Sequence, residues 1–472
     1  MSLSLYLCEL LLFGSILVAP INMLNLAPRS AKLVSSRARF CTHMAILSSS
    51  GQSFYESIGS PKFISAPMVD QSSLPWRMFV RQHGTDLAFS QMMHARNFMI
   101  DPKYRHDCID WDDYTHIDGS VELERQGRQW DQPLIAQLAG DDAETLVKAG
   151  RYIHHDVAAI DLNLGCPQKI AKRGHYGAYL LPDHDLVIHL LSAMVKELEC
   201  PITAKIRKLE NEEDTIRLCQ DIEAAGVSMI TVHGRLVTAS KLFTGPADWD
   251  IIRKVKQSVS IPVVANGGIG CYADAARCLE YTGADAVMSS EGLLENPKLF
   301  SPEGDRLFRE DFCRAQLRTA AEFVALVKAY PLPRPINQVI RGHLFKMLYR
   351  FISAEKNKDL QRQLAEGRFE EMCEVVDLLE RRLARLDFDT PTAEQQGYCL
   401  AHTYYMRHRN EQAQQRILSM PKLHKSRLKY QGAISRVDDN TTMSDDDLKI
   451  AQQQKLSDLK QRLLAKRELK RQ

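Results

Sequence analysis

The chain has 472 residues but lacks the cysteine patterns that build metal sites or disulfide frameworks. Its eleven cysteines are scattered, with no Cys-x-x-Cys pair and no Cys/His ligand spacing. Structural zinc sites and disulfide-rich secreted domains depend on such spacings, so neither class is indicated. Free thiols along the whole chain favour a reducing compartment.

A long, uninterrupted apolar run is also missing. Residues 5–27 are mostly apolar, but Glu9 and Pro20 interrupt them, and the positive charges follow this run instead of preceding it. A membrane helix needs about 20 apolar residues, and a secretory signal carries its charges first. The Arg/Ser-rich stretch that follows is typical of a mitochondrial transit peptide, and Met44 is an alternative start. We therefore treat 1–50 as a targeting-like or unassigned extension and expect a cytoplasmic or nuclear protein, or a mitochondrial one if the extension is genuine.

The chain has little net charge, and only the distribution of charge is informative. The total is +2, with 44% hydrophobic and 25% charged residues, which are ordinary globular values. From Pro391 to Gln472, however, 16 Lys or Arg face 9 Asp or Glu. A basic excess suits a polyanionic partner, although a charge run is more often a solvated surface. We expect 391–472 to be a polar, basic tail that is partly disordered or forms a solvated helix.

Short apolar strands alternating with helical patterns are present instead. The expected strands are 63–66, 87–89, 134–138, 158–162, 202–206, 229–232, 263–265 and 286–288. Eight such strands predict an α/β fold, a (β/α)8 TIM barrel, over residues 54–303. After Asn296-Pro297 only helical spacing continues, which predicts an all-helical domain at 304–390.

The most informative stretch, residues 158–180, reads AAIDLNLGCPQKIAKRGHYGAYL. A buried strand breaks at Gly165 and places Asn163 and Cys166 just past its carboxyl end, where α/β barrels keep their active sites. A lone cysteine is more often a small buried hydrophobe. Here a cationic loop follows, and we expect it to lower the pKa of the Cys166 thiol and let it exchange a proton near neutrality. The basic residues of this loop are Lys169, Lys172, Arg173 and His175.

Polar residues collect at the carboxyl ends of the other expected strands. A single buried Lys205 or His233 would usually be structural, but a shared location at one end of a barrel favours a common site. The residues at these strand ends are Pro67, Met68, Val69, Gln137, Lys205, Arg207, His233, Arg235, Asn266, Gly267, Gly268, Ser290 and Glu291.

The segment Asn266-Gly267-Gly268 precedes an expected helix at Ala273, a form that suits phosphate binding. It matches the dinucleotide fingerprint GxGxxG only in part and lacks the acidic ribose ligand, so we favour the phosphate of FMN. A flavin needs a cation near N1, amide partners for its pyrimidine edge and an anion cradle. The cation would be Lys205, the amide partner Gln137, and the anion cradle residues 266–268.

Three motifs carry a resemblance to a known family. Residues 161–167 (DLNLGCP) and 172–178 (KRGHYGA) resemble tRNA-dihydrouridine synthases, and 341–346 (RGHLFK) is similar to the eukaryotic branch acting at positions 16 and 17 of the D loop. The likeness covers roughly 63–351. It implies tightly bound FMN, NADPH or NADH as reductant, and reduction of the C5–C6 bond of uridine in tRNA.

The resemblance also implies residue roles. Cys166 would give the proton to C5 of the uracil, and Asn163 would hold the uracil edge. The family's flavin positions fall on Pro67, Met68, Val69, Gln137, Lys205, His233, Asn266, Gly267, Gly268, Ser290 and Glu291. Arg341 falls on the family's RNA-binding helix. From their charge alone, contacts to tRNA are also expected from Lys169, Lys172, Arg173, His175, Arg207, Arg334, His343 and Lys346. Ser290-Glu291 replaces the usual Gly-Arg, which leaves Arg235 or backbone N–H groups to hold the phosphate.

Two alternatives stay open from the sequence. One is an FMN barrel oxidoreductase acting on a free pyrimidine, which would need no basic helical domain. The other is a non-catalytic, RNA-binding barrel, which would bind no flavin. For the favoured interpretation we expect tRNA as the partner, a monomer, and neither a metal nor a membrane.

Overall fold

The structure is a computed structural model, and it describes residues 51–110, 131–239, 246–310, 312–329 and 336–383. The expected extension at 1–50, the tail from 391 and Arg334 lie outside the described residues. No helix in the described ranges is long and apolar enough to cross a membrane.

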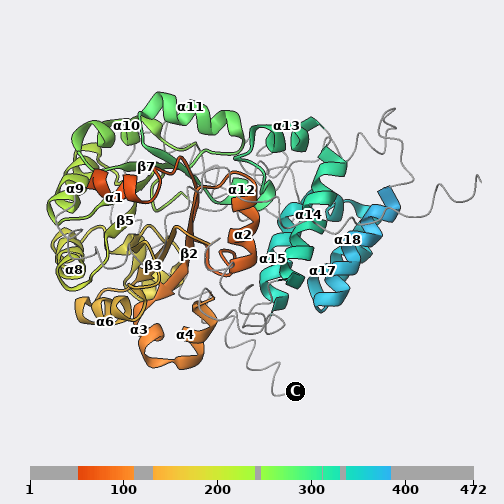
Figure 1. Cartoon of the computed structure of the whole chain (residues 1–472), viewed down its shortest axis with the longest axis horizontal. Helices are drawn as coiled ribbons and strands as arrows, with labels where there is room; N and C mark the ends of the chain where they lie inside the picture. Colours follow the sequence, from red (N-terminus) through yellow and green to blue (C-terminus); the bar gives the residue numbers. More distant parts are fainter. Residues whose placement is uncertain (1–50, 111–130, 240–245, 311, 330–335, 384–472) are drawn as a thin grey trace, which may run out of the picture. The chain divides into compact units, whose positions relative to one another are not determined.

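Eight parallel strands close into a barrel, which confirms the predicted fold (Figure 1). Each strand pairs with its neighbours in chain order, and β8 pairs with β1 through Ser65 and Ser289. The strands are β1 (Phe63–Ser65), β2 (Leu87–His94), β3 (Leu134–Ala139), β4 (Ala159–Leu164), β5 (Ile202–Arg207), β6 (Met229–His233), β7 (Val263–Asn266) and β8 (Ala286–Ser289).

The barrel is filled by apolar side chains from alternate strand positions. Ile64, Phe89, Met229 and Met288 belong to one buried cluster that also contains Phe54 of helix α1 (Gly51–Ser57). The hydroxyl of Tyr55, on the same helix, donates to the carbonyl oxygens of Pro61 and Asp285, next to the amino ends of β1 and β8. Helix α1 therefore covers the barrel at the amino ends of the strands. The carboxyl ends, where barrels of this kind have their active sites, are not covered by this helix.

The structure corrects the strand boundaries in two places. Strand β2 runs to His94 instead of ending at Phe89, with an irregular register between Phe89 and Met92. Strand β4 ends at Leu164, so Asn163 lies inside the strand and only Cys166 lies beyond it. The long connection after β2 begins with two short helices, α3 (Ala95–Ile100) and α4 (Pro102–Cys108).

Amphipathic helices cover the outside of the barrel, and several begin at a capping side chain. Asp142 accepts the N–H of Thr145 at the start of α6, and Asp248 accepts that of Ile251 at the start of α10. The outer helices are α2 (Leu74–Gln82), α6 (Ala143–Ile153), α8 (His184–Glu197), α9 (Glu212–Ala224), α10 (Trp249–Ser258) and α11 (Tyr272–Thr282).

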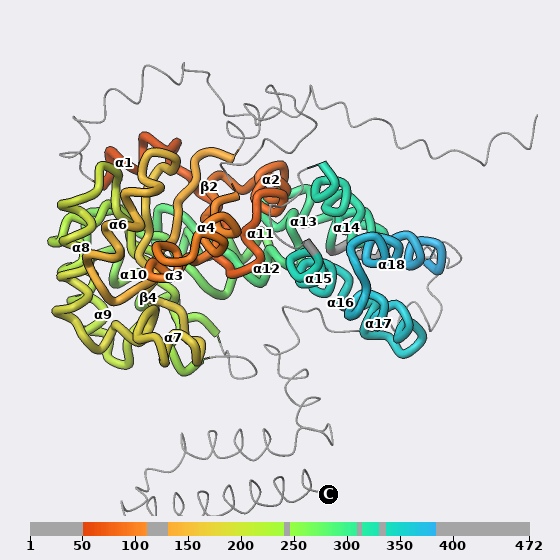
Figure 2. Tube along the Cα trace, turned by 90° about the horizontal axis from the view of Figure 1, so that it is seen from below, coloured from red at the N-terminus to blue at the C-terminus, as the bar shows by residue number. Residues whose placement is uncertain are grey.

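The chain after β8 is helical in the described residues, as the sequence predicts. Phe323, Leu344, Phe351 and Leu379 lie in its buried core. Helix α14 packs against α2 and α15 packs against α12, and Figure 2 shows α14 to α18 gathered beside the barrel. The helices are α12 (Glu291–Glu295), α13 (Pro302–Glu310), α14 (Phe312–Ala329), α15 (Ile336–Met347), α16 (Tyr349–Ile352), α17 (Lys358–Glu366) and α18 (Phe369–Leu383).

Candidate active site

The loop after β4 holds Cys166 at the mouth of the barrel. The chain turns through Pro167 into α7 (Lys169–Arg173) and returns through a short 3-10 helix, Gly177–Tyr179, whose Ala178 N–H donates to the Cys166 carbonyl at 3.2 Å. Gly177 has φ +67°, and a Cβ there would lie 2.9 Å from Cys166 Cβ. Only glycine fits this approach, so Gly177 helps to define the position of the cysteine.

The direction of the Cys166 pKa shift differs from the sequence-based expectation. Burial raises the pKa of the Cys166 thiol, and the charges of Arg207 and Lys205 oppose this only in part. The cationic loop does not lower the pKa because its basic side chains are exposed to water, where their field is screened. A thiol with a raised pKa stays protonated at neutral pH, and this suits a proton donor.

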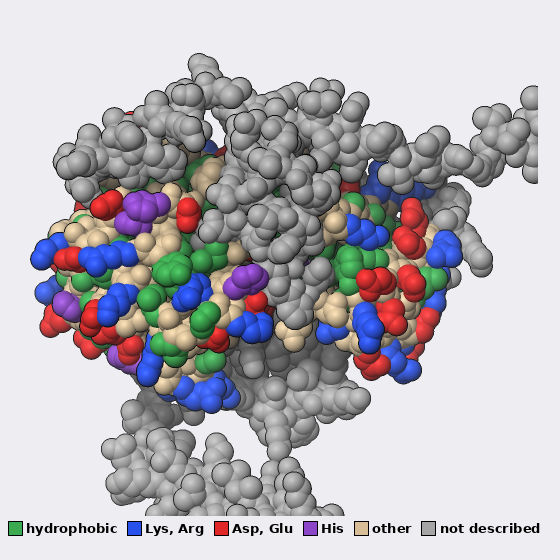
Figure 3. Space-filling model, turned by 60° about the horizontal axis from the view of Figure 1, so that its bottom comes forward, with side chains coloured by type: hydrophobic (Ala, Val, Ile, Leu, Met, Phe, Trp, Pro, Cys, Tyr) green, Lys and Arg blue, Asp and Glu red, His purple; other side chains and the backbone are tan. Residues whose placement is uncertain are grey.

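The four basic residues of the loop lie on the surface beside Cys166. Lys169, Lys172, Arg173 and His175 are all exposed, and Lys172 Nζ lies 6.0 Å from the ring centre of Tyr179. His175 Nδ1 is 3.2 Å from Asp141 Oδ2. Over the face drawn in Figure 3, basic and acidic side chains are interspersed, so attraction of a polyanion depends on local groups such as these.

A series of buried hydrogen bonds runs beneath the mouth from β5 to the loop of Cys166. Thr203 Oγ1 donates to Asp161 Oδ1 at 2.7 Å, and Gln137 Nε2 donates to Asp161 Oδ2 at 2.8 Å. Asn163 Nδ2 donates to Gln137 Oε1 at 2.7 Å. Asn163 Oδ1 accepts the N–H groups of Gly165 at 3.1 Å and Cys166 at 3.0 Å. Asn163 therefore shapes the loop of Cys166, and these bonds use only one of its two amide hydrogens.

Lys205 places a cation inside the mouth. Its Nζ donates to Asn266 Oδ1 at 3.0 Å, and Asn266 Nδ2 donates to the Met288 carbonyl at 2.9 Å. Burial, with help from Arg207, lowers the pKa of Lys205 to about 8. None of the ion pairs found among the described residues includes Lys205. This side chain is suited to stabilise an anionic ligand, because its charge is not neutralised by a directly bonded carboxylate.

Arg207, expected to contact tRNA, is turned toward the backbone. Its Nε donates to the Gly165 carbonyl at 2.8 Å, and its Nη1 donates to the Leu236 carbonyl at 2.9 Å. Burial and the nearby Arg235 lower the pKa of Arg207 to about 10. The side chain ties the loop of Cys166 to the loop that follows β6.

The glycines after β7 pack closely against the end of β6. Gly267 and Gly268 have φ +103° and +83°, and a Cβ on Gly267 would lie 2.8 Å from His233 Cδ2. Trp249 Nε1 donates to the Gly267 carbonyl at 3.0 Å. Arg235 Nη1 lies 3.2 Å from His233 Nε2. The structure thus brings together the strand-seven glycines, His233 and Arg235, ahead of the helix α11.

Ser290 and Glu291 begin the neighbouring helix α12, and both are half-buried. Ser289, the last residue of β8, donates through its hydroxyl to the Ile269 carbonyl at 3.0 Å. This bond joins the end of β8 to the loop that contains Gly267 and Gly268. The two expected phosphate-binding segments are therefore neighbours.

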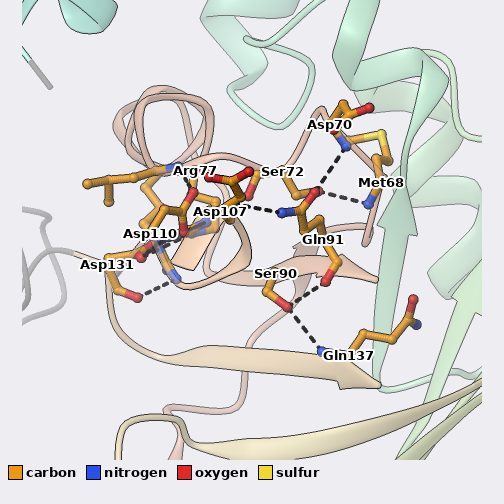
Figure 4. A network of polar contacts seen from close by, with 12 residues as sticks. Met68, Asp70, Ser72, Arg77, Ser90, Gln91, Asp107, Asp110, Asp131 and Gln137 are labelled. Atoms are coloured by element: carbon orange, nitrogen blue, oxygen red, sulfur yellow. Dashed lines mark hydrogen bonds and ion pairs between the residues drawn. The ribbon is translucent and has the colours of Figure 1, made fainter. Parts of the chain in front are cut away.

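The loop after β1 follows the strand that pairs with β8, and Figure 4 shows its polar contacts. Met68 N–H donates to Ser72 Oγ at 2.9 Å, and Asp70 N–H donates to Gln91 Oε1 at 3.3 Å. Val69, the residue after Met68, is 50% exposed, as single apolar side chains on a protein surface often are.

A buried arginine supports this loop from below. Arg77 donates to the Ser72 carbonyl at 2.6 Å and to Asp110 Oδ1 at 2.9 Å, and its Nη2 lies 2.6 Å from Asp131 Oδ2 (Figure 4). Asp110 also accepts the Leu74 N–H at 2.8 Å. Arg77 is fully buried, so these bonds compensate the cost of removing its charge from water.

Sequence reasoning missed several residues of the site. Asp161 stands inside the quoted motif, and a charged residue in a buried strand could have singled it out. The ring of His94 lies edge-on to Tyr176 at 4.9 Å, and its buried Nδ1 has no hydrogen-bond partner among the described residues. Burial lowers the pKa of His94. No sequence signal pointed to His94, because β2 was expected to end before it.

The helical region modifies the expected tRNA contacts. The assignment of His343 to phosphate binding is wrong, because its ring is fully buried and stacks on Trp76 at 4.4 Å. Arg341 donates to the carbonyl oxygens of Leu364 at 3.1 Å and Gly367 at 3.0 Å, at the end of α17. Lys346 Nζ donates to Gln71 Oε1 at 2.8 Å, in the loop after β1. Within the described ranges, no group of three or more His, Cys, Asp or Glu residues is placed to hold a metal ion.

Comparison with known proteins identifies close sequence relatives. A model of the dihydrouridine synthase (Dus) family matches residues 64–383. The tRNA-dihydrouridine(16/17) synthase [NAD(P)(+)] of Schizosaccharomyces pombe is 36% identical over 346 residues, which cover 71% of this chain and 81% of that protein. The corresponding Saccharomyces cerevisiae enzyme is 36% identical, covering 64% of this chain and 69% of its own. A Mus musculus tRNA-dihydrouridine(16/17) synthase-like protein is 37% identical, covering 65% of this chain and 59% of its own.

Proposed function

This chain belongs to the dihydrouridine synthase family, and we propose that it reduces uridines 16 and 17 in the D loop of tRNA to dihydrouridine. The choice of positions is supported by the names of the relatives from both yeasts and the mouse. The observation that carries the proposal is a half-buried thiol, Cys166, whose pKa is raised by burial and which is held at the mouth of the barrel near Lys205.

The residues present fit a tightly bound FMN. Lys205 supplies a half-buried cation, Gln137 supplies a buried amide whose orientation is fixed by Asp161 and Asn163, and Gly267 and Gly268 bring backbone close to His233. The donor set therefore matches an anionic, planar ligand with a phosphate. A bound FMN would supply the hydride for C6 of the uracil, and NADPH or NADH would supply its electrons.

Cys166 completes the reaction by giving its proton to C5 of the uracil. Its raised pKa keeps the thiol protonated at neutral pH until the developing negative charge at C5 takes the proton. Asn163 and Gly177 hold the loop of Cys166 in place, and Arg207 ties this loop to the loop that follows β6. The remaining amide hydrogen of Asn163 is available to a uracil oxygen.

A uridine in folded RNA must leave its stack to reach Cys166, because the site lies at a barrel mouth. The exposed basic residues beside the mouth, Lys169, Lys172, Arg173 and His175, would contact the flanking phosphates. We propose that the barrel, 54–303, carries the chemistry and that the helical domain, 304–390, contacts tRNA with Arg341 and Lys346. We further propose a monomer that acts in the cytoplasm or nucleus.

The test uses the full chain, purified and incubated with unmodified tRNA and either NADPH or NADH. The proposal predicts a yellow protein and dihydrouridine at positions 16 and 17, mapped by reverse transcription after borohydride treatment. Free uridine and orotate serve as control substrates. Reduction of a free pyrimidine in place of tRNA, or a colourless folded protein, would contradict the proposal.

A further inference from the structure

Asp161 is a fully buried carboxylate that lies below the candidate site without touching the barrel mouth itself. It lies in β4, between Gln137 of β3 and Thr203 of β5, which pair with β4 on either side. Both of its oxygens accept hydrogen bonds, at 2.8 Å from Gln137 and 2.7 Å from Thr203. The proposed chemistry assigns it no role.

An ionised carboxylate can only accept hydrogen bonds. This property fixes which group donates and which accepts at each hydrogen bond from Asp161 to the loop of Cys166. Because Asp161 offers no hydrogen, Gln137 must turn its Nε2 toward it, which turns Oε1 toward Asn163. Asn163 must then donate through Nδ2, which leaves its Oδ1 for the N–H groups of Gly165 and Cys166. Reversing either amide would bring two donors or two acceptors together.

We propose that Asp161 is a positioning residue that fixes the amide orientations of Gln137 and Asn163, and through them the loop of Cys166. This inference rests on the proposed function for the roles of Gln137 and Asn163 toward flavin and uracil. In this arrangement a single buried acceptor, the Asp161 carboxylate, fixes the positions of both the Gln137 amide, which would contact the flavin, and the proton donor Cys166.

The charges around Asp161 are consistent with this role. The hydrogen bonds from Gln137 and Thr203 favour its ionised form, as does the charge of Lys205, two residues beyond Thr203 on the neighbouring strand β5. Burial opposes them and raises the pKa of Asp161 to about 6. The group is therefore an acceptor at the pH at which the enzyme would be assayed.

The test compares two replacements of Asp161. Asp161→Leu keeps a similar volume but removes the acceptor, so Gln137 loses its fixed orientation. Asp161→Asn can still present an oxygen to Gln137 while its NH2 donates to the Thr203 hydroxyl, which can accept as well as donate. The matched control is Asp285→Asn, the same change at the opposite end of the barrel, where Asp285 accepts from Val263 N–H and Lys256.

Two readouts require neither tRNA nor turnover. The first is the FMN dissociation constant of apoprotein, and the second is the iodoacetamide alkylation rate of Cys166, followed by mass spectrometry of its peptide. For folded Asp161→Leu we expect FMN binding to weaken about tenfold and alkylation to accelerate about threefold, because the buried donors of Gln137 and Thr203 lose their acceptor and the loop loosens. Asp161→Asn and Asp285→Asn should stay within about twofold of the wild type for both readouts.

A double replacement keeps the test decisive if Asp161→Leu does not fold. Adding Thr203→Val to Asp161→Asn removes the hydroxyl that accepts from the new amide, so the loss of FMN affinity should reappear, whereas Thr203→Val alone should have a small effect. The proposal is overturned if folded Asp161→Leu matches the wild type in both readouts, or if adding Thr203→Val to Asp161→Asn changes neither.

The proposed function can fail separately from this inference. If wild-type protein binds FMN but leaves tRNA unreduced, the substrate assignment fails and both readouts still test Asp161. If wild-type protein binds no FMN, the alkylation rates alone decide whether Asp161 positions the loop of Cys166.

Discussion

At the scale of single residues, the site depends on burial at least as much as on sequence neighbours. Four basic residues near Cys166 suggest a low thiol pKa, but they lie in water while the thiol is half-buried, and its pKa is raised. Sequence shows which charges are near along the chain and not how well solvent screens them. The motif did predict Cys166 at a strand end, because a barrel strand that breaks at Gly165 can deliver it only there.

The charge of Lys205 should make FMN binding dependent on pH. Its pKa is about 8 before any ligand binds, so the side chain is positively charged below this pH and neutral above it. We expect the FMN dissociation constant to rise above pH 8 by up to about tenfold per pH unit. Titration of apoprotein between pH 7 and 9.5 measures this. Lys205→Met should bind weakly with no such rise, and an equal rise in the variant would exclude Lys205 as its cause.

Gly177 provides a second test at this scale. Gly177→Ala should lower dihydrouridine formation at least about tenfold, because the new Cβ would meet Cys166 Cβ at 2.9 Å and displace the proton donor. Gly283→Ala is the matched control, since Gly283 has nearly the same φ, +66°, with nothing within 4 Å of the added Cβ. The left-handed φ should cost each variant about 1 kcal/mol of stability, and Gly177→Ala should lose more because of the clash. Equal activity of the two variants would show that the contact with Cys166 is unimportant.

At the scale of elements, apolar periodicity located all eight strands, because barrel strands are buried on both faces and read as apolar runs. Strand β2 was predicted too short, since Ser90 and Gln91 are polar and the register is irregular there. Their side chains form hydrogen bonds with other segments: Ser90 Oγ accepts the Gln137 N–H at 3.1 Å, and Gln91 Oε1 accepts the Asp70 N–H. Such bonds between distant segments leave no local signal.

The support of the β1 loop by Arg77 gives a prediction about stability. Arg77→Met would leave Asp110 buried without its cation and Asp131 with Arg81 Nε at 3.6 Å, and we expect the free energy of unfolding to fall by about 3–5 kcal/mol. Urea denaturation with tryptophan fluorescence measures the change. The control, Lys148→Met, removes an exposed pair with Glu144 and should cost less than about 0.5 kcal/mol. A loss for Arg77→Met as small as that of the control would contradict this account.

At the scale of the whole molecule, the sequence predicted a helical region after the barrel but not how the two meet. Helix α15 reaches the barrel through His343, which stacks on Trp76 of α2, and through Lys346, which bonds to Gln71. A histidine within a basic motif looked like a phosphate ligand. Its burial follows from packing between distant segments, which no local pattern reports.

This contact should make the protein less stable in acid. Burial and the charge of Lys346 lower the pKa of His343 well below 6.5, so the unfolded chain binds a proton that the folded protein does not. Stability should therefore fall below pH 6.5, by up to about 1.4 kcal/mol per pH unit from this residue. His343→Phe keeps the stack on Trp76 and should remove that part of the loss. Unfolding at pH 7.5 and 5.5 measures it, and an unchanged difference in the variant would refute the role of His343.

The central claim is that Cys166 gives the proton to uracil C5 in tRNA, and single-turnover reduction tests it most directly. Wild-type protein and Cys166→Ala, each reduced anaerobically with NADPH, are mixed with unmodified tRNA, and dihydrouridine is measured over time. We predict equal reduction of the flavin by NADPH in both proteins and at least about 100-fold slower dihydrouridine formation in the variant. Dihydrouridine formed at the wild-type rate by Cys166→Ala would contradict the claim.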